Sequence, residues 1–141
     1  MITELALSTL MVSLTVAIHG VGLHGLAKLL GLEAREEAQE HLSALSLRGF
    51  LVTLLAILAI FALHGAEIWL YAFLYVALGA VEGLRDAVYF STITYGAIGY
   101  SDAVMAERWR LVSAIEGING IILIGWSTAF FITVIARLRR I

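Results

Sequence analysis

Cysteine and proline are both absent from the 141 residues, and charged side chains are scarce. Without cysteine, the chain can form no disulfide, thiolate metal site or cysteine nucleophile. Without proline, any break in a helix must come from glycine or from a loop. Charged residues make up 14% of the chain, against about 25% in a typical soluble domain. Hydrophobic residues make up 61%, so the composition favours a membrane protein over a soluble one.

The charge balance and the missing motifs exclude further classes of function. The formal net charge is −2, which leaves no basic surface of the kind that binds nucleic acid. The sequence contains no recognisable nucleophile–base pair and no phosphate-binding loop, so we do not expect an enzyme. A membrane-embedded binding or transport protein is the class that remains.

Three long apolar segments stand out, at residues 5–32, 47–80 and 111–136. Each is long enough to cross the hydrocarbon core of a bilayer, which takes about 20 residues. Between the second and third lies a shorter amphipathic segment, residues 84–95, whose helix would rise only ~18 Å. Because it is too short to cross, we interpret it as a re-entrant half-helix that enters and leaves the membrane on one side.

Lysine and arginine are distributed unevenly about these segments. With three crossings, six of them lie on the side of the first loop and the C-terminus, and three lie on the other side. Basic residues are enriched in cytoplasmic loops. The sequence therefore predicts a multi-pass protein of the cell (inner or plasma) membrane, with its C-terminus in the cytoplasm and its N-terminus and the loop after the half-helix outside.

The loop after the half-helix carries the chemistry. Residues 90–102 read FSTITYGAIGYSD, and this stretch resembles the pore loop of the potassium channel superfamily, whose TVGYG carbonyls replace the hydration shell of the ion. The resemblance covers residues 66–136 and is closest to small bacterial members with an extra N-terminal helix. The positions that match the filter are Ala97, Ile98, Gly99, Tyr100 and Ser101.

The resemblance implies an all-α integral membrane fold with three transmembrane helices, a re-entrant pore half-helix and a selectivity-filter loop. Residues 1–46 would form the extra helix and a cytoplasmic loop, and residues 47–141 the channel pore domain. One copy cannot enclose a filter, so we expect a homo-oligomer around a central pore, with a homotetramer implied by the family. Its partners would be its own copies and the lipid bilayer, with no cofactor beyond potassium or other monovalent cations as permeant ions.

Two departures from the family filter bear on selectivity. Ala97 stands where the family has threonine, so the innermost ion site loses a hydroxyl. Ser101 replaces the second glycine, and a left-handed conformation there would cost a non-glycine residue ~1–2 kcal/mol. Gly96 also stands where the family usually has another threonine. We therefore expect a cation-selective pore with a reduced preference for potassium over sodium.

Several residues near the predicted filter each have two interpretations. Asp102 either concentrates cations at the pore mouth or is a solvated loop carboxylate. One set of polar residues lies within the second and third spans: Glu116, Asn119 and Glu67. Because polar groups in membranes usually face protein or water, these residues either support the filter from behind or are unrelated groups at helix interfaces. The third span contains three glycines, Gly117, Gly120 and Gly125. They either form a hinge or allow close helix packing.

The histidines leave a second class of function open. His19 and His24 could be metal or haem ligands, but they are five residues apart, which is not the spacing of a pair on one helix face. We therefore favour the interpretation that they are hydrogen-bonded histidines that pack between helices. A haem-binding membrane anchor would need histidines from two spans, but we place His19 about 9 Å and His64 about 24 Å from the inner surface, too far apart for one iron. A non-conducting channel-like subunit or scaffold is the other alternative, since the filter is altered. Trp126 either constricts the pore or faces lipid.

Overall fold

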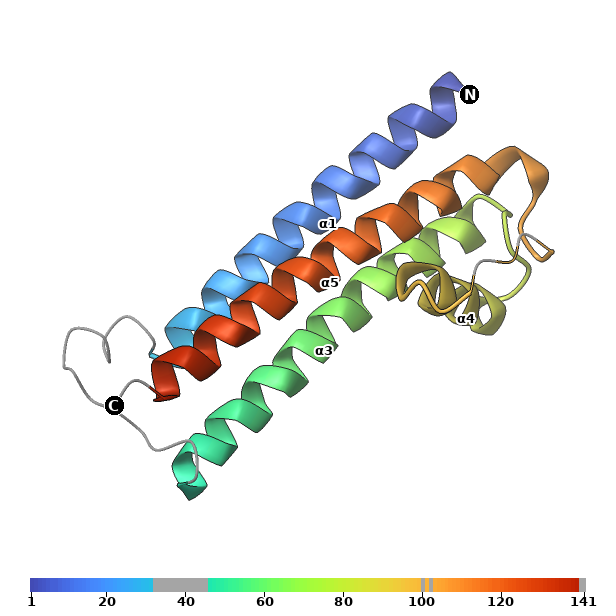
Figure 1. Ribbon diagram of the computed structural model, residues 1–141. Coiled ribbons are helices and arrows are strands. Elements are labelled where there is room, and N and C mark those ends of the chain that lie inside the picture. The colour runs from blue at the N-terminus through green and yellow to red at the C-terminus, as the bar shows by residue number, and fades with distance from the viewer. Residues whose placement is uncertain (32–45, 100, 102, 140–141) are drawn as a thin grey trace.

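The computed structural model describes residues 1–31, 46–99, 101 and 103–139, with side chains described as far as residue 137. Within these residues the fold is all-helical. Its elements are α1 (Ile2–Leu29), α3 (Leu47–Ala77), α4 (Leu84–Tyr95), the 3-10 turn η1 (Glu107–Trp109) and α5 (Arg110–Arg139). The three long helices contact one another in pairs, and α4 packs against both α3 and α5 (Figure 1).

Three of these helices are long and apolar enough to cross a membrane, namely Ile2–Leu29, Leu47–Ala77 and Glu107–Arg137. They correspond to the three predicted spans and differ from them by a few residues at each end. The short helix α4 has the bounds predicted for the half-helix. The chain is therefore a multi-pass, all-helical membrane protein with one additional short helix beside its spans.

Helix α4 starts at the end of the bundle where α3 finishes and α5 begins. Gly79 and Gly83 have positive φ angles of 61° and 82°, a conformation that glycine adopts at little cost, and they reverse the chain before α4. The two connecting segments meet where the amide of Ala106 donates to the carbonyl of Ala80 at 2.8 Å. The other end of α4 lies beside Gly120, about 15 Å along α5 from its first residue. The chain thus runs inward along α4 and returns to the same end.

The long helices are staggered. Leu26 and Leu30, at the end of α1, share a buried cluster with Ala56 of α3 and Val134 of α5. Ala56 comes nine residues after the start of α3, so α3 extends about 13 Å beyond the level at which α1 ends. The overhang of α3 is visible in Figure 1. It decides which side chains of α1 and α3 lie at the same level.

Candidate functional site

One face of α3 carries a row of polar side chains that points into the bundle. His64, Glu67, Tyr71 and Tyr75 are separated by three or four residues, which places them on one side of a helix. Glu67, Tyr71 and Tyr75 are buried. Every one of the four is hydrogen-bonded to another helix, so this row is the centre of a polar layer that joins all four helices.

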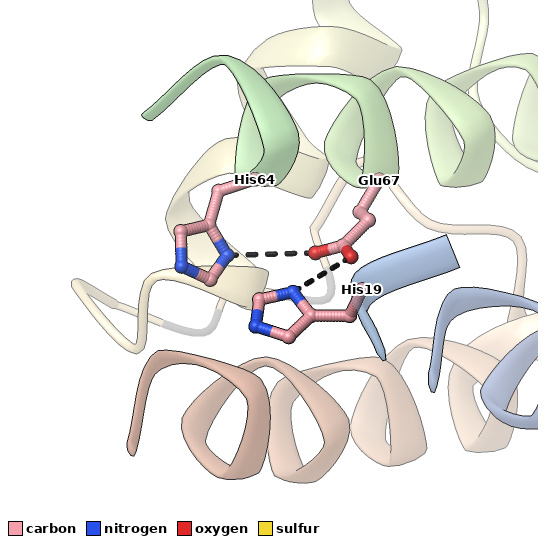
Figure 2. A group of neighbouring side chains, drawn as sticks. All are labelled: His19, His64 and Glu67. Carbon is pink, nitrogen blue, oxygen red and sulfur yellow. Dashed lines mark hydrogen bonds and ion pairs between the residues drawn. The ribbon is translucent and has the colours of Figure 1, made fainter. Parts of the chain in front are cut away.

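Glu67 is the point where three of those helices meet. Its carboxylate lies 2.9 Å from Nδ1 of His19 on α1 and accepts a hydrogen bond from the hydroxyl of Tyr95 on α4. Nδ1 of His64, one turn earlier on α3, is 3.4 Å from the carboxylate and 3.0 Å from the Tyr95 hydroxyl. Figure 2 shows both imidazole rings directed at the carboxylate, one from each of the two helices.

The predicted separation in depth between His19 and His64 is wrong. Their ring centroids are 5.1 Å apart, because α3 overhangs α1 and His64 is brought level with His19. Depth therefore does not argue against a shared ligand. A haem held between the two rings is disfavoured for another reason, since the rings contact each other and both Nδ1 atoms face Glu67. His24 is exposed and takes no part in this cluster.

A second buried carboxylate, Glu116 of α5, also bonds to α4. It accepts hydrogen bonds from the hydroxyls of Tyr75 and Ser91, and Ser91 also lies 3.0 Å from the carbonyl of Ile68. Ser91 and Tyr95 are four residues apart on one face of α4. The two predicted support residues Glu67 and Glu116 therefore each hold one turn of the short helix, and whether they support an ion filter stays a prediction.

Asn119, the third predicted support residue, lies away from α4. Its amide nitrogen is 2.8 Å from the hydroxyl of Thr15 on α1 and 3.3 Å from the hydroxyl of Tyr71 on α3. It therefore links the two other long helices through α5. Hydrogen bonds between helices in a membrane are worth about 0.6–2 kcal/mol each, so Asn119 helps to fix α1 against the rest of the bundle.

The three glycines of α5 have different surroundings. A Cβ at Gly120 would lie 2.2 Å from the carbonyl oxygen of Tyr95, whereas one at Gly117 would be 3.5 Å from the carbonyl oxygen of Thr94 and one at Gly125 would meet nothing within 4 Å. The contacts at Gly120 thus favour close helix packing over hinge bending. Trp126 contacts α1, with its ring centroid 5.4 Å from that of His19, a placement that neither sequence interpretation anticipated.

The loop after α4 begins with a tight, hydrogen-bonded turn. The amides of Ala97 and Ile98 donate to the carbonyls of Thr94 and Ile93, the pattern of a Schellman motif, whose left-handed residue is usually glycine. Here that residue is Ala97, with φ of 52°, and it is the single non-glycine residue with positive φ in the described part of the chain. The strain of a left-handed non-glycine residue is thus found at Ala97, and the strain expected at Ser101 stays a prediction. Tyr100 and Asp102 lie outside the described residues.

A groove lies beside this turn. It is lined by α4, the turn and α5, through Thr94, Ala97, Ser113, Ala114, Gly117, Ile118 and Ile121. The Thr94 hydroxyl is buried and has no hydrogen-bond partner among the described residues. A buried polar group without a partner costs about 1–3 kcal/mol. The groove therefore borders one buried hydroxyl that no described residue satisfies.

Several polar residues of the layer escaped the sequence interpretation, although their spacing gives a signal. Thr15 and His19 are four apart on α1, and Ser127 on α5 lies 3.1 Å from Nε2 of His19. Tyr71 and Tyr75 continue the row that starts at His64. Each residue is unremarkable alone, but polar side chains repeated at three- or four-residue intervals within an apolar span indicate a face buried against protein.

Comparison with known proteins places the bundle in context. A family model described as an ion channel matches residues 49–137, which include nearly all of α3, all of α4 and most of α5 and leave out α1. No curated protein and no solved structure matches the chain.

Proposed function

Because the chain belongs to this ion channel family, we propose that it is the pore-forming subunit of a cation channel that conducts potassium with reduced selectivity. The observation that carries the proposal is the course of the chain from α4 to α5. It runs inward along α4, turns beside Gly120 at mid-bundle and returns to the end from which it came. Such a path is suited to a re-entrant helix followed by a loop that lines a pore.

Electrostatics at the turn support a cation rather than an anion. The C-terminal end of α4 carries the negative end of the helix dipole, and it lies at the turn around Ala97. No lysine or arginine lines the adjacent groove. In the pore that we propose, backbone carbonyls of residues 97–101 provide oxygen ligands for the permeant ion, and Asp102 lies at the outer mouth.

The groove beside the turn also supports assembly. In a single copy, Ile118 and Ile121 are exposed next to the unpartnered hydroxyl of Thr94. In a closed symmetric ring, this surface would either pack against a neighbouring copy or face the pore. We propose four copies, as the resemblance to potassium channels implies. The lysine and arginine bias places the turn at the outer side and the C-terminus in the cytoplasm.

Reduced selectivity follows from Ala97. It provides no side-chain hydroxyl at the inner end of the proposed filter, and its left-handed backbone is strained by about 1–2 kcal/mol. With fewer oxygen ligands at its inner end, the proposed filter would discriminate less between a dehydrated potassium ion and a partly hydrated sodium ion. The same turn favours a second candidate function, a non-conducting subunit, because the amides of Ala97, Ile98 and Gly99 donate back to the end of α4 and hold the start of the proposed filter against that helix.

Ion flux into liposomes separates these two functions. We expect the reconstituted protein to pass potassium faster than sodium and to exclude chloride. Since the chain has no cysteine, a single Ile98→Cys substitution offers one target for a charged thiol reagent, and its modification should reduce the flux. Arg108→Cys, exposed near the same end of the bundle, is the matched control and should be unaffected. Flux no faster than in empty liposomes, from correctly assembled protein, contradicts conduction and favours the non-conducting subunit.

A further inference from the structure

A cluster of metal-ligand type lies outside the proposed ion path, where α1 meets the family-matched helices. We propose that His19, His64 and Glu67 bind a divalent transition-metal ion such as Zn²⁺. Each offers one ligand atom, and these atoms all lie within 4.8 Å of one another. A tetrahedral Zn²⁺ site with bonds of about 2.0–2.2 Å needs ligand atoms roughly 3.4 Å apart. The ligand atoms would therefore have to approach one another by up to about 1.4 Å to hold the ion.

The donor set selects the class of ion. Two imidazoles and one carboxylate form the three-ligand set of open zinc sites, which keep a fourth position for another oxygen. Calcium and magnesium prefer oxygen ligands throughout, as does the dehydrated potassium ion. An ion held by His19 and His64 is therefore chemically distinct from the permeant cation that we propose for the turn.

The charge of Glu67 favours a cation at this place. Its side chain is fully buried, and its ion-pair partners among the described residues are the two histidines. A carboxylate moved out of water is costly unless it is paired or coordinates a metal. Neutral histidines supply hydrogen bonds to Glu67 but no positive charge, whereas a divalent ion supplies the charge.

The hydrogen bonds around the cluster can be satisfied both with a metal ion bound and without one. Nε2 of His19 is 3.1 Å from the Ser127 hydroxyl. When Nε2–H donates to Ser127, the lone pair of Nδ1 is free for a metal, as outer partners of ligating histidines usually arrange. In the other tautomer, Nδ1–H donates to Glu67 and the Ser127 hydroxyl donates to Nε2. The Tyr95 hydroxyl lies 3.0 Å from Nδ1 of His64 and donates to Glu67 in the metal-free state.

A metal ion bound at this place would have two consequences. It joins α1, which the family match leaves out, to α3, so a bound ion would tie the extra helix to the bundle. It also competes for Glu67 with Tyr95, the last residue of α4, which directly precedes the proposed filter loop. We therefore expect Zn²⁺ to change the ion flux, a step that rests on the proposed channel function. The metal site itself does not depend on it.

Metal binding is measured on the full chain, purified in its assembled form in detergent. After equilibrium dialysis against Zn²⁺, elemental analysis should give about one tightly held ion per chain. His19→Gln and His64→Gln each remove one ligand but keep a hydrogen-bonding side chain, and each should weaken Zn²⁺ binding by at least about tenfold. His24→Gln is the matched control, because His24 is exposed on the same helix, and its affinity should equal that of the wild type.

Two results would overturn the metal site. One is wild-type protein that retains no Zn²⁺ at micromolar concentration, and the other is undiminished binding by both His19→Gln and His64→Gln. If the His19→Gln protein fails to assemble, Ser127→Ala takes its place beside His64→Gln. Ser127→Ala keeps all three ligands but removes the hydrogen-bond partner that orients His19, so it should also weaken Zn²⁺ binding. Liposome flux with Zn²⁺ or with a chelator then tests the coupling. Protein that binds Zn²⁺ but passes no ions keeps the site and contradicts the channel function alone.

Discussion

Substitution of Gly120 by alanine tests the packing of α4 against α5 most directly. The added Cβ would lie 2.2 Å from the carbonyl oxygen of Tyr95 and 2.9 Å from its carbonyl carbon. Real Cβ atoms essentially never come within 3.0 Å of another heavy atom, so the two helices must separate by about 0.8 Å or more. Both obstructing atoms belong to the backbone, and no side-chain rotation can relieve the clash.

The separation also disturbs the two carboxylate contacts of α4. Overpacking typically costs 1–3 kcal/mol, and lengthening the bonds from Tyr95 to Glu67 and from Ser91 to Glu116 adds to it. We expect a loss of about 2–3 kcal/mol, which lowers the midpoint of thermal unfolding by roughly 5–10 °C. Fluorescence-detected size-exclusion chromatography after heating measures this midpoint in detergent, and liposome flux should fall with it.

Two neighbouring glycines provide matched controls in the same helix. A Cβ at Gly125 meets nothing within 4 Å, and one at Gly117 makes an ordinary contact at 3.5 Å. Gly125→Ala should be neutral or stabilising by up to ~1 kcal/mol, because alanine is the better helix former. Gly117→Ala should be close to neutral. If Gly120→Ala unfolds at the temperature of Gly125→Ala, α4 does not pack on α5 as described and the inward course of the chain is refuted.

Substitutions at three further positions test the turn and the polar layer, each by the same heating assay. Ala97→Gly should raise stability by about 1 kcal/mol, because it removes the strain of a left-handed non-glycine residue, whereas Ala97→Thr should lower it; equal midpoints would exclude that backbone conformation. Glu116→Gln should cost less than Glu116→Ala, since an amide can still accept from Tyr75 and contact Ser91; equal losses would argue against those bonds. Asn119→Ala should cost about 1–2 kcal/mol, and an unchanged midpoint would show that its two bonds do not join the helices.

The helices were predictable from the sequence because their signals are local. A span of about 20 apolar residues has few other stable states in a bilayer, and the length of the segment from Leu84 to Tyr95 already excludes a fourth crossing. Glycines before and after that segment also mark its ends. For these reasons the three spans and the bounds of α4 agree with the structure.

The partners of the buried polar groups were not predictable, because they depend on how far one helix slides along another. Depth counted from the ends of the apolar runs separated His19 from His64, and the overhang of α3 brings them together. The backbone at Ala97 is a similar case. The hydrogen bonds that close the end of α4 put a left-handed residue at Ala97, a conformation that depends on how the chain leaves the helix and that the sequence did not indicate.

The polar layer implies that α1 is integral to this bundle, although it lies outside the family match. Lipid is as apolar as the helices, so the hydrophobic effect does not hold helices together inside a bilayer, and polar contacts and close packing must do so. α1 supplies both, through Thr15 to Asn119 and through His19 to Glu67 and Ser127. Without α1, Glu67 would lose one of its three partners and remain buried against α4. A carboxylate that holds the last residue of α4 thus depends on the extra helix, so α1 would influence the filter loop that we propose.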